Sequence, residues 1–279
     1  LSKKDASIVE NKEKTKKYLE KGNFPFPKGK SFWFWETKKS IKYGVYEIGF
    51  PLVVKPRGGS VARHVSTNIN SIFDLKLAIK KANQYSPIFI VEKFMADSFV
   101  YRATVVDFDY VAVVKQIPAN VEGDGVLTIE ELIKAKNGEL IRGELHEKNF
   151  TLYKIIINDT TSKILKENNQ CLKTILKLNK IVYLQRDPFL KLGGDLIEVT
   201  LDVHSDNIKL FKDIARYFDI RLVGMDFMIP DITKSWRNQN CAIIELNSMP
   251  AIEMHHYPYK GVPKNVAREV VNLFIKYYG

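Results

Sequence analysis

Short apolar runs that alternate with amphipathic stretches are the feature that most restricts the fold of this 279-residue chain. Phe50–Lys55 is a strand-like run closed by Pro56, and Ile88–Val91 is a run of the buried-strand type. Between them, Asp74–Asn83 carries apolar residues at helical spacing. This alternation predicts an α/β composition for the first third of the chain.

The rest of the chain predicts a larger mixed lobe. Val100–Val106 and Tyr110–Val114 are β-rich runs separated by Asp107-Phe108-Asp109, which indicates a hairpin. Asn207–Phe218 is a clear amphipathic helix, with Ser205 or Asp206 placed to cap its start. The other expected elements are helices at Ile8–Glu20, Thr37–Glu47, Thr128–Lys136 and Val266–Tyr277 and strands at Leu222–Ile229 and Ala242–Leu246. The polar stretch Asn137–Asn149 carries no pattern of either kind.

Composition narrows the class of protein. The formal charge of +11 favours anionic partners, although lysines spread along the chain also suit ordinary solvated helix faces. Cys171 and Cys241 are too few for a disulfide framework and belong to no zinc-binding cluster. No apolar run approaches the ~20 residues of a membrane helix, and the lysine-rich start lacks a signal-peptide core. We expect a cytoplasmic protein without a membrane partner.

Three polar residues on the last two predicted strands suggest a metal site. Glu245 and Asn247 are two residues apart on one strand, so they share a face, and Asp226 can join them from the neighbouring strand. Mg²⁺ prefers an octahedral shell of oxygens, usually one or two carboxylates together with water and nucleotide phosphates. The alternative interpretation is that these residues only cap turns.

Upstream residues favour a phosphate-binding interpretation. Lys55 ends a strand at the loop Gly58-Gly59-Ser60, where an ammonium and backbone N–H groups can surround phosphates. Glu92 ends the next apolar strand, where a carboxylate can hold the exocyclic amine of adenine. Arg102 lies on the following strand and can reach a phosphoryl group or a carboxylate bidentately, or is simply a surface cation.

In this order, the chain resembles the ATP-grasp module of cyanophycin synthetases and of bifunctional glutamate-cysteine ligase/glutathione synthetases. The resemblance covers nearly the whole chain. The segments that carry it are Asn11–Lys16, Phe50–Pro56, Val91–Phe94, Gly123-Asp124-Gly125, Gly193-Gly194-Asp195, Val203–Asn207, Glu245-Leu246-Asn247 and Met254–Gly261. It implies an α+β, ATP-grasp fold in which ATP lies in the cleft between a small lobe and a larger mixed-sheet lobe. The expected boundaries are 1–22 for a leading helical segment, 23–94 for the small lobe and 95–279 for the large lobe.

The resemblance also implies roles for individual residues. ATP and Mg²⁺ would be the cofactors, with two Mg²⁺ ions expected and Mn²⁺ as an alternative metal. Lys55 and Arg102 would act in catalysis. The nucleotide contacts would come from Lys12, Lys55, Gly58, Gly59, Ser60, Glu92, Lys93, Phe94 and Asp97, and the metal ligands would be Asp226, Glu245 and Asn247.

Some positions depart from the family pattern. Ala62 and His64 stand where the cyanophycin-type loop favours glycine, which puts its closure over ATP in question. Phe99 occupies the offset of the ribose-binding acid, so Asp97 is the nearest candidate. Lys191 and Gln116 replace residues in regions that can touch the substrate, so substrate identity does not transfer. His255 lies near the implied substrate cleft, and we favour a packing role for it.

The resulting hypothesis is an ATP-dependent carboxylate-amine ligase that forms a peptide bond through an acyl phosphate on amino-acid or short-peptide substrates. A catalytically degenerate ATP-grasp protein that binds nucleotide without turnover is the alternative. A nucleic-acid-binding protein that stacks bases on Phe32-Trp33-Phe34-Trp35 is a third interpretation, which a strand beginning a core explains more cheaply. We expect no nucleic-acid partner and leave homo-oligomerisation open.

Overall fold

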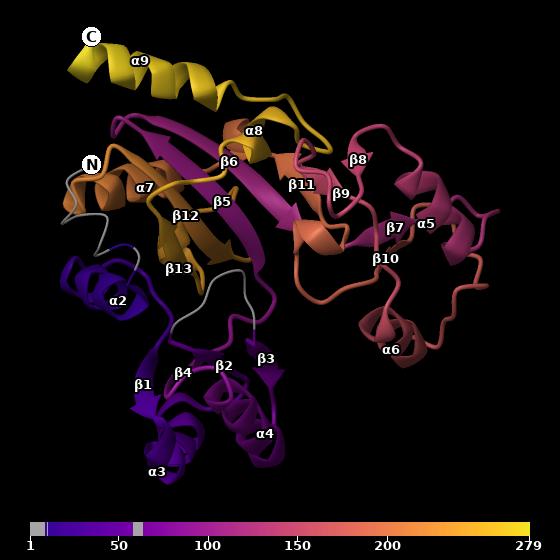
Figure 1. Ribbon diagram of the computed structural model, residues 1–279, viewed down its shortest axis with the longest axis horizontal. Helices are drawn as coiled ribbons and strands as arrows, with labels where there is room; N and C mark the ends of the chain where they lie inside the picture. The colour runs from indigo at the N-terminus through magenta and orange to yellow at the C-terminus, as the bar shows by residue number, and fades with distance from the viewer. Residues whose placement is uncertain (1–8, 10, 58–63) are drawn as a thin grey trace.

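A four-stranded antiparallel sheet forms the base of the small lobe (Figure 1). The computed structural model describes residues 9, 11–57 and 64–279. Four strands pair in the order β1-β4-β2-β3, namely β1 (Gly29–Trp33), β4 (Ile88–Lys93), β2 (Leu52–Pro56) and β3 (Ser66–Ile69). The helix α3 (Thr37–Lys42), which continues as a π-helical segment Tyr43–Ile48, and the helix α4 (Ile72–Asn83) complete the lobe.

Helix α4 covers the small sheet because its apolar residues recur at helical spacing. Its N-cap residue Ser71 accepts a hydrogen bond from the backbone N–H of Asp74, and the helix begins there. One face is buried against β2 and β4, and the buried residues are Leu75, Ala78, Ile79, Ala82, Leu52, Val54, Phe89 and Val91. The predicted helix and both predicted strands of this lobe are confirmed.

The aromatic run 32–35 is divided between core and surface. Phe32 is buried in the small-lobe core. Trp33 and Trp35 are exposed and stack with their ring centroids 4.7 Å apart. The prediction of a strand that begins a core therefore holds for Phe32, whereas Phe34 and Trp35 belong to a short 3-10 helix after β1.

The second sheet forms the large lobe, with strand order β11-β6-β5-β12-β13. Its strands are β11 (Asp195–Glu198), β6 (Tyr110–Ile117), β5 (Phe99–Val106), β12 (Leu222–Ile229) and β13 (Ala242–Asn247). The predicted hairpin joins β5 to β6, and its turn holds Asp107 at φ 48° and Phe108 at φ 62°. The two predicted late strands, β12 and β13, are confirmed as neighbours.

Helix α7 (Ser205–Tyr217) packs on one face of the large sheet. Phe211 of α7 meets Phe227 of β12 edge-to-face at 5.3 Å between ring centroids. The helix is capped by His204, whose Nδ1 accepts a hydrogen bond from the backbone N–H of Asp206 at 3.1 Å. The prediction that Ser205 or Asp206 is the cap was therefore wrong, because the imidazole nitrogen replaces the usual hydroxyl or carboxylate oxygen. The opposite face meets α8 (Glu253–His256) and α9 (Val266–Tyr278).

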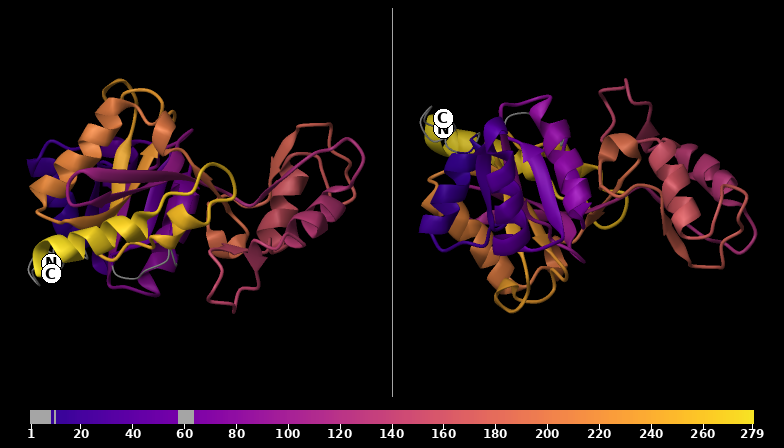
Figure 2. Two further views of the ribbon diagram at one scale, coloured as in Figure 1. Left: turned by 90° about the horizontal axis from the view of Figure 1, so that it is seen from above. Right: turned by 90° about the horizontal axis from the view of Figure 1, so that it is seen from below.

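A third unit is inserted between the neighbouring strands β6 and β11 and projects from the large lobe (Figures 1 and 2). It has its own apolar core, which contains Ile129, Leu165 and Leu184. Its elements are β7 (Asn120–Glu122), α5 (Ile129–Asn137), β8 (Arg142–Gly143), β9 (Leu152–Tyr153), α6 (Asp159–Glu167) and β10 (Ile181–Tyr183). The lobe boundaries at residues 22 and 94 stay a prediction.

Helix α2 (Lys12–Lys21) contacts both lobes. The Asn11 side chain caps it by accepting from the backbone N–H groups of Glu13 and Lys14, and Gly22 ends it. The predicted helix Ile8–Glu20 is confirmed from Lys12 onward, whereas Asn11, predicted inside it, is extended and forms the cap. None of the helices in the described ranges is long and apolar enough to cross a membrane.

The packing of α7 on β12 gives a test of the large-lobe core. Phe227→Ala removes a fully buried ring, so we expect the free energy of unfolding to fall by about 3–5 kcal/mol. Phe274→Ala, on the exposed side of α9, should change it by less than about 0.5 kcal/mol. Urea denaturation followed by circular dichroism measures both, and equal losses would contradict the assigned core.

Candidate active site

The pairing of β12 with β13 brings the three predicted metal ligands together. Asp226 lies directly opposite Glu245, and Gly224 lies opposite Asn247. Because opposed residues share a face of an antiparallel sheet and Glu245 and Asn247 are two residues apart, all three side chains project from one face. They are partly exposed, whereas the intervening Leu246 is buried in the core beneath α7.

These residues fit a magnesium ion by donor chemistry. Two carboxylates and one amide supply only oxygen ligands, as Mg²⁺ prefers when water or phosphate completes its shell. The Nδ2 atom of Asn247 is buried and has no hydrogen-bond partner among the described residues, so this N–H group can donate to an oxygen of a ligand, while Oδ1 is the atom that can coordinate a metal. Within the described ranges, no group of three or more His, Cys, Asp or Glu side chains could hold a metal ion. The candidate site therefore depends on the Asn247 amide as its third ligand.

Arg102 joins the same face from β5. Its Nε atom donates to Asp226 Oδ1 at 2.7 Å and its Nη2 atom donates to Oδ2 at 3.1 Å, a bidentate pair between directly opposed residues. Burial works against the charged form, but Asp226 and then Glu245 outweigh it and raise the pKa of Arg102. The guanidinium therefore stays charged beside the carboxylates.

A buried cluster on the small lobe faces this site across α2. The Glu92 carboxylate on β4 pairs with Lys55 of β2 and lies 3.5 Å from the Nζ atom of Lys16 of α2. Burial works to raise the pKa of Glu92, but Lys55 and Lys16 outweigh it and hold that pKa below its ordinary value. The same burial lowers the pKa of Lys16.

Helix α2 connects the two sites. Lys12 lies 3.9 Å from Glu245 of the large lobe, and Lys16, one turn later, lies beside Glu92 of the small lobe. Both lysines line the same small cavity, together with Lys55. Three ammonium groups and two carboxylates thus meet between the lobes. Sequence reasoning missed Lys16, although its spacing of four residues from Lys12 places both on one helix face.

The other predicted nucleotide contacts are Lys93, Phe94, Asp97 and the loop Gly58-Gly59-Ser60, and no ion pair or side-chain cluster of the described residues tests their roles. The backbone N–H groups of Lys93 and Phe94 donate to Lys28 O at 2.8 Å and to Pro51 O at 3.1 Å. Asp97 is exposed in the turn before β5, at φ 55°. Gly58, Gly59 and Ser60 lie outside the described residues, as does Ala62. Their predicted roles stay predictions.

His255 is a packed residue. It is fully buried on α8, and its Nε2 atom lies 2.8 Å from Thr104 Oγ1. Its Nδ1 atom lies 3.5 Å from Glu198 Oε2. The structure therefore gives His255 the packing position that we favoured from the sequence.

Known proteins resemble this chain over nearly its whole length. The chain is 32% identical over 268 residues to a cyanophycin synthetase of Synechocystis sp., covering 94% of this chain and 30% of that protein. It is 33% identical over 273 residues to the glutathione biosynthesis bifunctional protein GshAB of Enterococcus faecalis, covering 95% of this chain and 35% of that protein. The chain thus spans about a third of the length of the curated relatives it matches. No protein-family model matches it.

Solved structures give the same result for the fold. A bifunctional glutathione synthetase from Pasteurella multocida superposes at a TM-score of 0.74 with 26% identity, over 99% of this chain and 38% of that one. A D-alanine–D-alanine ligase from Bacillus anthracis and the ATP-grasp ligase PsnB share the fold at 13% and 10% identity, with TM-scores of 0.54 and 0.52. The predicted ATP-grasp fold and the predicted resemblance are confirmed.

Gly224 gives room to the Arg102–Asp226 pair. A Cβ atom at Gly224 would lie 2.8 Å from Pro250 Cβ and 3.3 Å from Arg102 Cδ. We expect Gly224→Ala to lower the free energy of unfolding by about 1–3 kcal/mol, because neither neighbour can yield freely. In the control Gly138→Ala, φ is −80° and the new Cβ atom would lie no closer than 3.2 Å to its neighbours. Thermal denaturation compares them, and a smaller loss at Gly224 than at Gly138 would contradict the crowding.

The Glu92 cluster gives a second test. Glu92→Gln leaves two lysines without their buried carboxylate, so we expect a loss of about 3–5 kcal/mol in the free energy of unfolding at pH 7. The exposed Glu47→Gln should be nearly neutral. Because the folded state lowers the pKa of Glu92, its stabilisation is present above the ordinary value of 4.5 and is lost as pH falls through the lowered value. Denaturation at pH 7 and pH 3 measures this, and a loss that persists undiminished in acid would contradict the assignment.

Proposed function

We propose that this chain is an ATP-dependent ligase that joins a carboxylate to an amine through an acyl phosphate. The observation that carries the proposal is the single face of β5, β12 and β13 on which Arg102 and the three oxygen ligands lie. The ATP-grasp fold and the resemblance to two kinds of amide-forming synthetase support it. The substrates we infer are amino acids or short peptides.

In this proposal Asp226, Glu245 and Asn247 hold Mg²⁺, with two ions expected and Mn²⁺ as an alternative. When bound, the metal would neutralise phosphate charge and polarise the phosphoryl group that is transferred. Arg102 is held ready beside Asp226 to stabilise charge on the transferring phosphoryl group. Because it is already oriented by two hydrogen bonds, it needs little reorganisation during the reaction.

The lysines between the lobes would bind the triphosphate. In the structure Lys55 pairs with Glu92 and Lys12 lies near Glu245, so their carboxylates keep the ammonium groups at the cleft. A triphosphate would draw these lysines from their partners while Lys16 continues to balance Glu92. The predicted adenine role of Glu92, Lys93 and Phe94 and the ribose role of Asp97 belong to the same proposal.

The proposed reaction has two steps, a phosphoryl transfer and an aminolysis. A carboxylate oxygen of the first substrate attacks the γ-phosphorus, the bond to the β-phosphate oxygen breaks, and ADP leaves. The neutral amine then attacks the acyl carbon, phosphate leaves with that carboxylate oxygen, and the proton that the amine loses passes to the phosphate or to water. Gln116 lies on the same face as Arg102, two residues beyond the position that opposes it on β6, so it is a candidate for contact with a substrate. We infer a cytoplasmic setting for this reaction.

Asp226→Asn tests the proposal. The change removes one negative charge from the metal site but retains an oxygen acceptor for Arg102. We expect amine-dependent ADP release in a panel of amino acids and dipeptides to fall at least about 100-fold, because metal stabilisation is worth several kcal/mol. Asp213→Asn, at a partly exposed position of α7, is the matched control and should keep full activity.

Two results would contradict the ligase. ADP release that is undiminished in the folded Asp226→Asn protein would remove the metal assignment. A wild-type protein that binds Mg-ATP without amine-dependent ADP release would favour the nucleotide-binding alternative instead.

A further inference from the structure

A second pocket lies between the third unit and the edge of the large sheet. Its volume is about 430 Å³, within the range of roughly 300–1,000 Å³ that is typical of small-molecule sites. Residues of β6 and β11, of α5, β7 and β10, and of the segment 259–260 line it. The cavity beside α2, by contrast, measures about 30 Å³.

Strand register separates this pocket from the candidate active site. Arg102 opposes Val114 on β6, so Val114 lies on the face that carries Asp226 and Glu245. Successive side chains of a strand point to opposite faces, so Lys115 and Ile117 project from the other face. They oppose the pocket residues Ile197 and Asp195 of β11. The pocket is therefore on the reverse side of the sheet.

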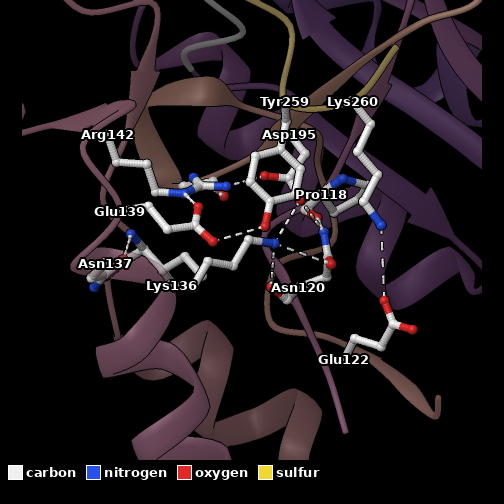
Figure 3. A network of polar contacts seen from close by, with 12 residues as sticks. Pro118, Asn120, Glu122, Lys136, Asn137, Glu139, Arg142, Asp195, Tyr259 and Lys260 are labelled. Atoms are coloured by element: carbon white, nitrogen blue, oxygen red, sulfur yellow. Dashed lines mark hydrogen bonds and ion pairs between the residues drawn. The ribbon is translucent and has the colours of Figure 1, made fainter. Parts of the chain in front are cut away.

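The inner wall of the pocket is a fixed ionic network. Asp195 is buried and accepts hydrogen bonds from Arg142, from Lys136 at 2.7 Å and from Asn120 at 2.8 Å (Figure 3). Lys136 also donates to the backbone oxygen of Asn120 at 2.9 Å. Because these groups satisfy one another, they hold the third unit against the sheet edge and give the pocket a preformed wall.

The rim of the pocket offers charged groups of both signs that are loosely held. Lys260 and Glu122 are 3.9 Å apart, with side chains 62% and 48% exposed. An exposed pair of this kind contributes only about 0–1 kcal/mol, so a ligand can replace either partner at little cost. Glu139 is held more firmly, because it accepts from the Tyr259 hydroxyl at 3.0 Å and its Oε2 atom is buried, without a hydrogen-bond partner among the described residues. That oxygen lies 3.6 Å from Nε of Arg142.

The charge pattern selects the class of ligand. Apart from Lys136 and Asp195, which already pair within the wall network that includes Arg142, two lysines and two carboxylates line the pocket, and these residues are Lys115, Lys260, Glu122 and Glu139. A balanced set does not favour a polyanion such as a nucleotide, whereas a molecule with one ammonium and one carboxylate finds a partner for each. Leu132 and Ile181 supply apolar wall for its body.

We propose that this pocket is a binding site for a zwitterionic amino acid or short peptide, separate from the catalytic face. This second-site proposal rests on the proposed function only for the choice of ligand, because a peptide-forming ligase encounters amino acids and short peptides as substrates and products. Lys260 would pair with the carboxylate of the ligand, and Glu122 with its ammonium. The pocket can be filled or emptied without Mg-ATP.

Calorimetric titration without nucleotide tests the site. The probes are glycylglycine, L-alanyl-L-lysine and L-alanyl-L-glutamate, with N-acetyl-glycylglycine amide as the probe that lacks both charges. We expect saturable binding of at least one zwitterionic probe and none of the blocked one. If no zwitterion binds, or if the blocked probe binds equally well, the proposal is wrong.

Two variants locate the binding. Lys260→Glu reverses the rim charge and should weaken binding about ten-fold or more, whereas Lys76→Glu on the exposed side of α4 should leave it unchanged. Ala135→Trp places a ring in the pocket from an exposed position of α5 and should abolish binding without disturbing a core. Unchanged affinity in both pocket variants would overturn the proposal.

The variant Asp226→Asn separates this inference from the ligase. Dipeptide binding should persist in that protein, because Asp226 lies on the other face of the sheet. Loss of dipeptide binding would place the ligand in the catalytic cleft and overturn the second site. Loss of ADP release with binding retained would support both proposals, and activity retained with binding retained would sink only the metal assignment.

Discussion

The register of β12 between β5 and β13 determines where the proposed catalytic side chains lie. It places Arg102, Asp226 and Glu245 in one row across three strands. A shift of one residue would turn Asp226 into the core beneath α7 and bring Met225 or Phe227 to the open face, because the side-chain period of a strand is two. The apolar residues of β12 that pack against α7 therefore fix the position of the polar ones.

The Arg102–Asp226 ion pair in this row matters more for the proposed binding of metal and phosphate than for the free energy of unfolding. Arg102 and Asp226 are each only 13% exposed, and the cost of removing two charges from water offsets much of their attraction. A hydrophobic pair in these positions would stabilise the sheet to at least the same degree as the ion pair. A charged pair is retained, beside Glu245 and with Gly224 leaving it room, which is the expected arrangement if the face binds metal and phosphate.

Helix α2 carries charged residues that pair with carboxylates on both sides of the cleft. Its side chains meet carboxylates of both lobes, through Lys12 at Glu245 and Lys16 at Glu92, while Leu19 is anchored in the large-lobe core. A ligand that alters either ion pair also alters how α2 is held. The proposed nucleotide site and the proposed metal site, which lie on different sheets, therefore both contact α2.

Much of the fold could be predicted because apolar periodicity is strong where an element is buried on one side. The strands β2, β4, β5, β6, β12 and β13 and the helices α4 and α7 all show it. Strand β11 could not be predicted, because it is four residues long with an acid at each end. The third unit was not foreseen, since its strands have two or three residues and its core forms only from distant segments.

Some residues of the candidate site could be predicted from the sequence, and others could not. Asp226 and Glu245 could be predicted, because each interrupts an apolar strand that needs no acid for packing. Lys16 could not be distinguished from the other lysines of its segment until the structure showed Glu92 beside it. The His204 cap was missed because a histidine nitrogen rarely takes that role.

Isotope transfer from the carboxylate to phosphate tests the ligase most directly. The wild-type protein would be incubated with Mg-ATP and a mixture of amino acids labelled with ¹⁸O in their carboxylates, and the released phosphate would be analysed by mass spectrometry. An acyl-phosphate route predicts one ¹⁸O atom in each phosphate, together with a new amide product of matching yield. Phosphate that carries no label, or release of AMP in place of ADP, would contradict the account.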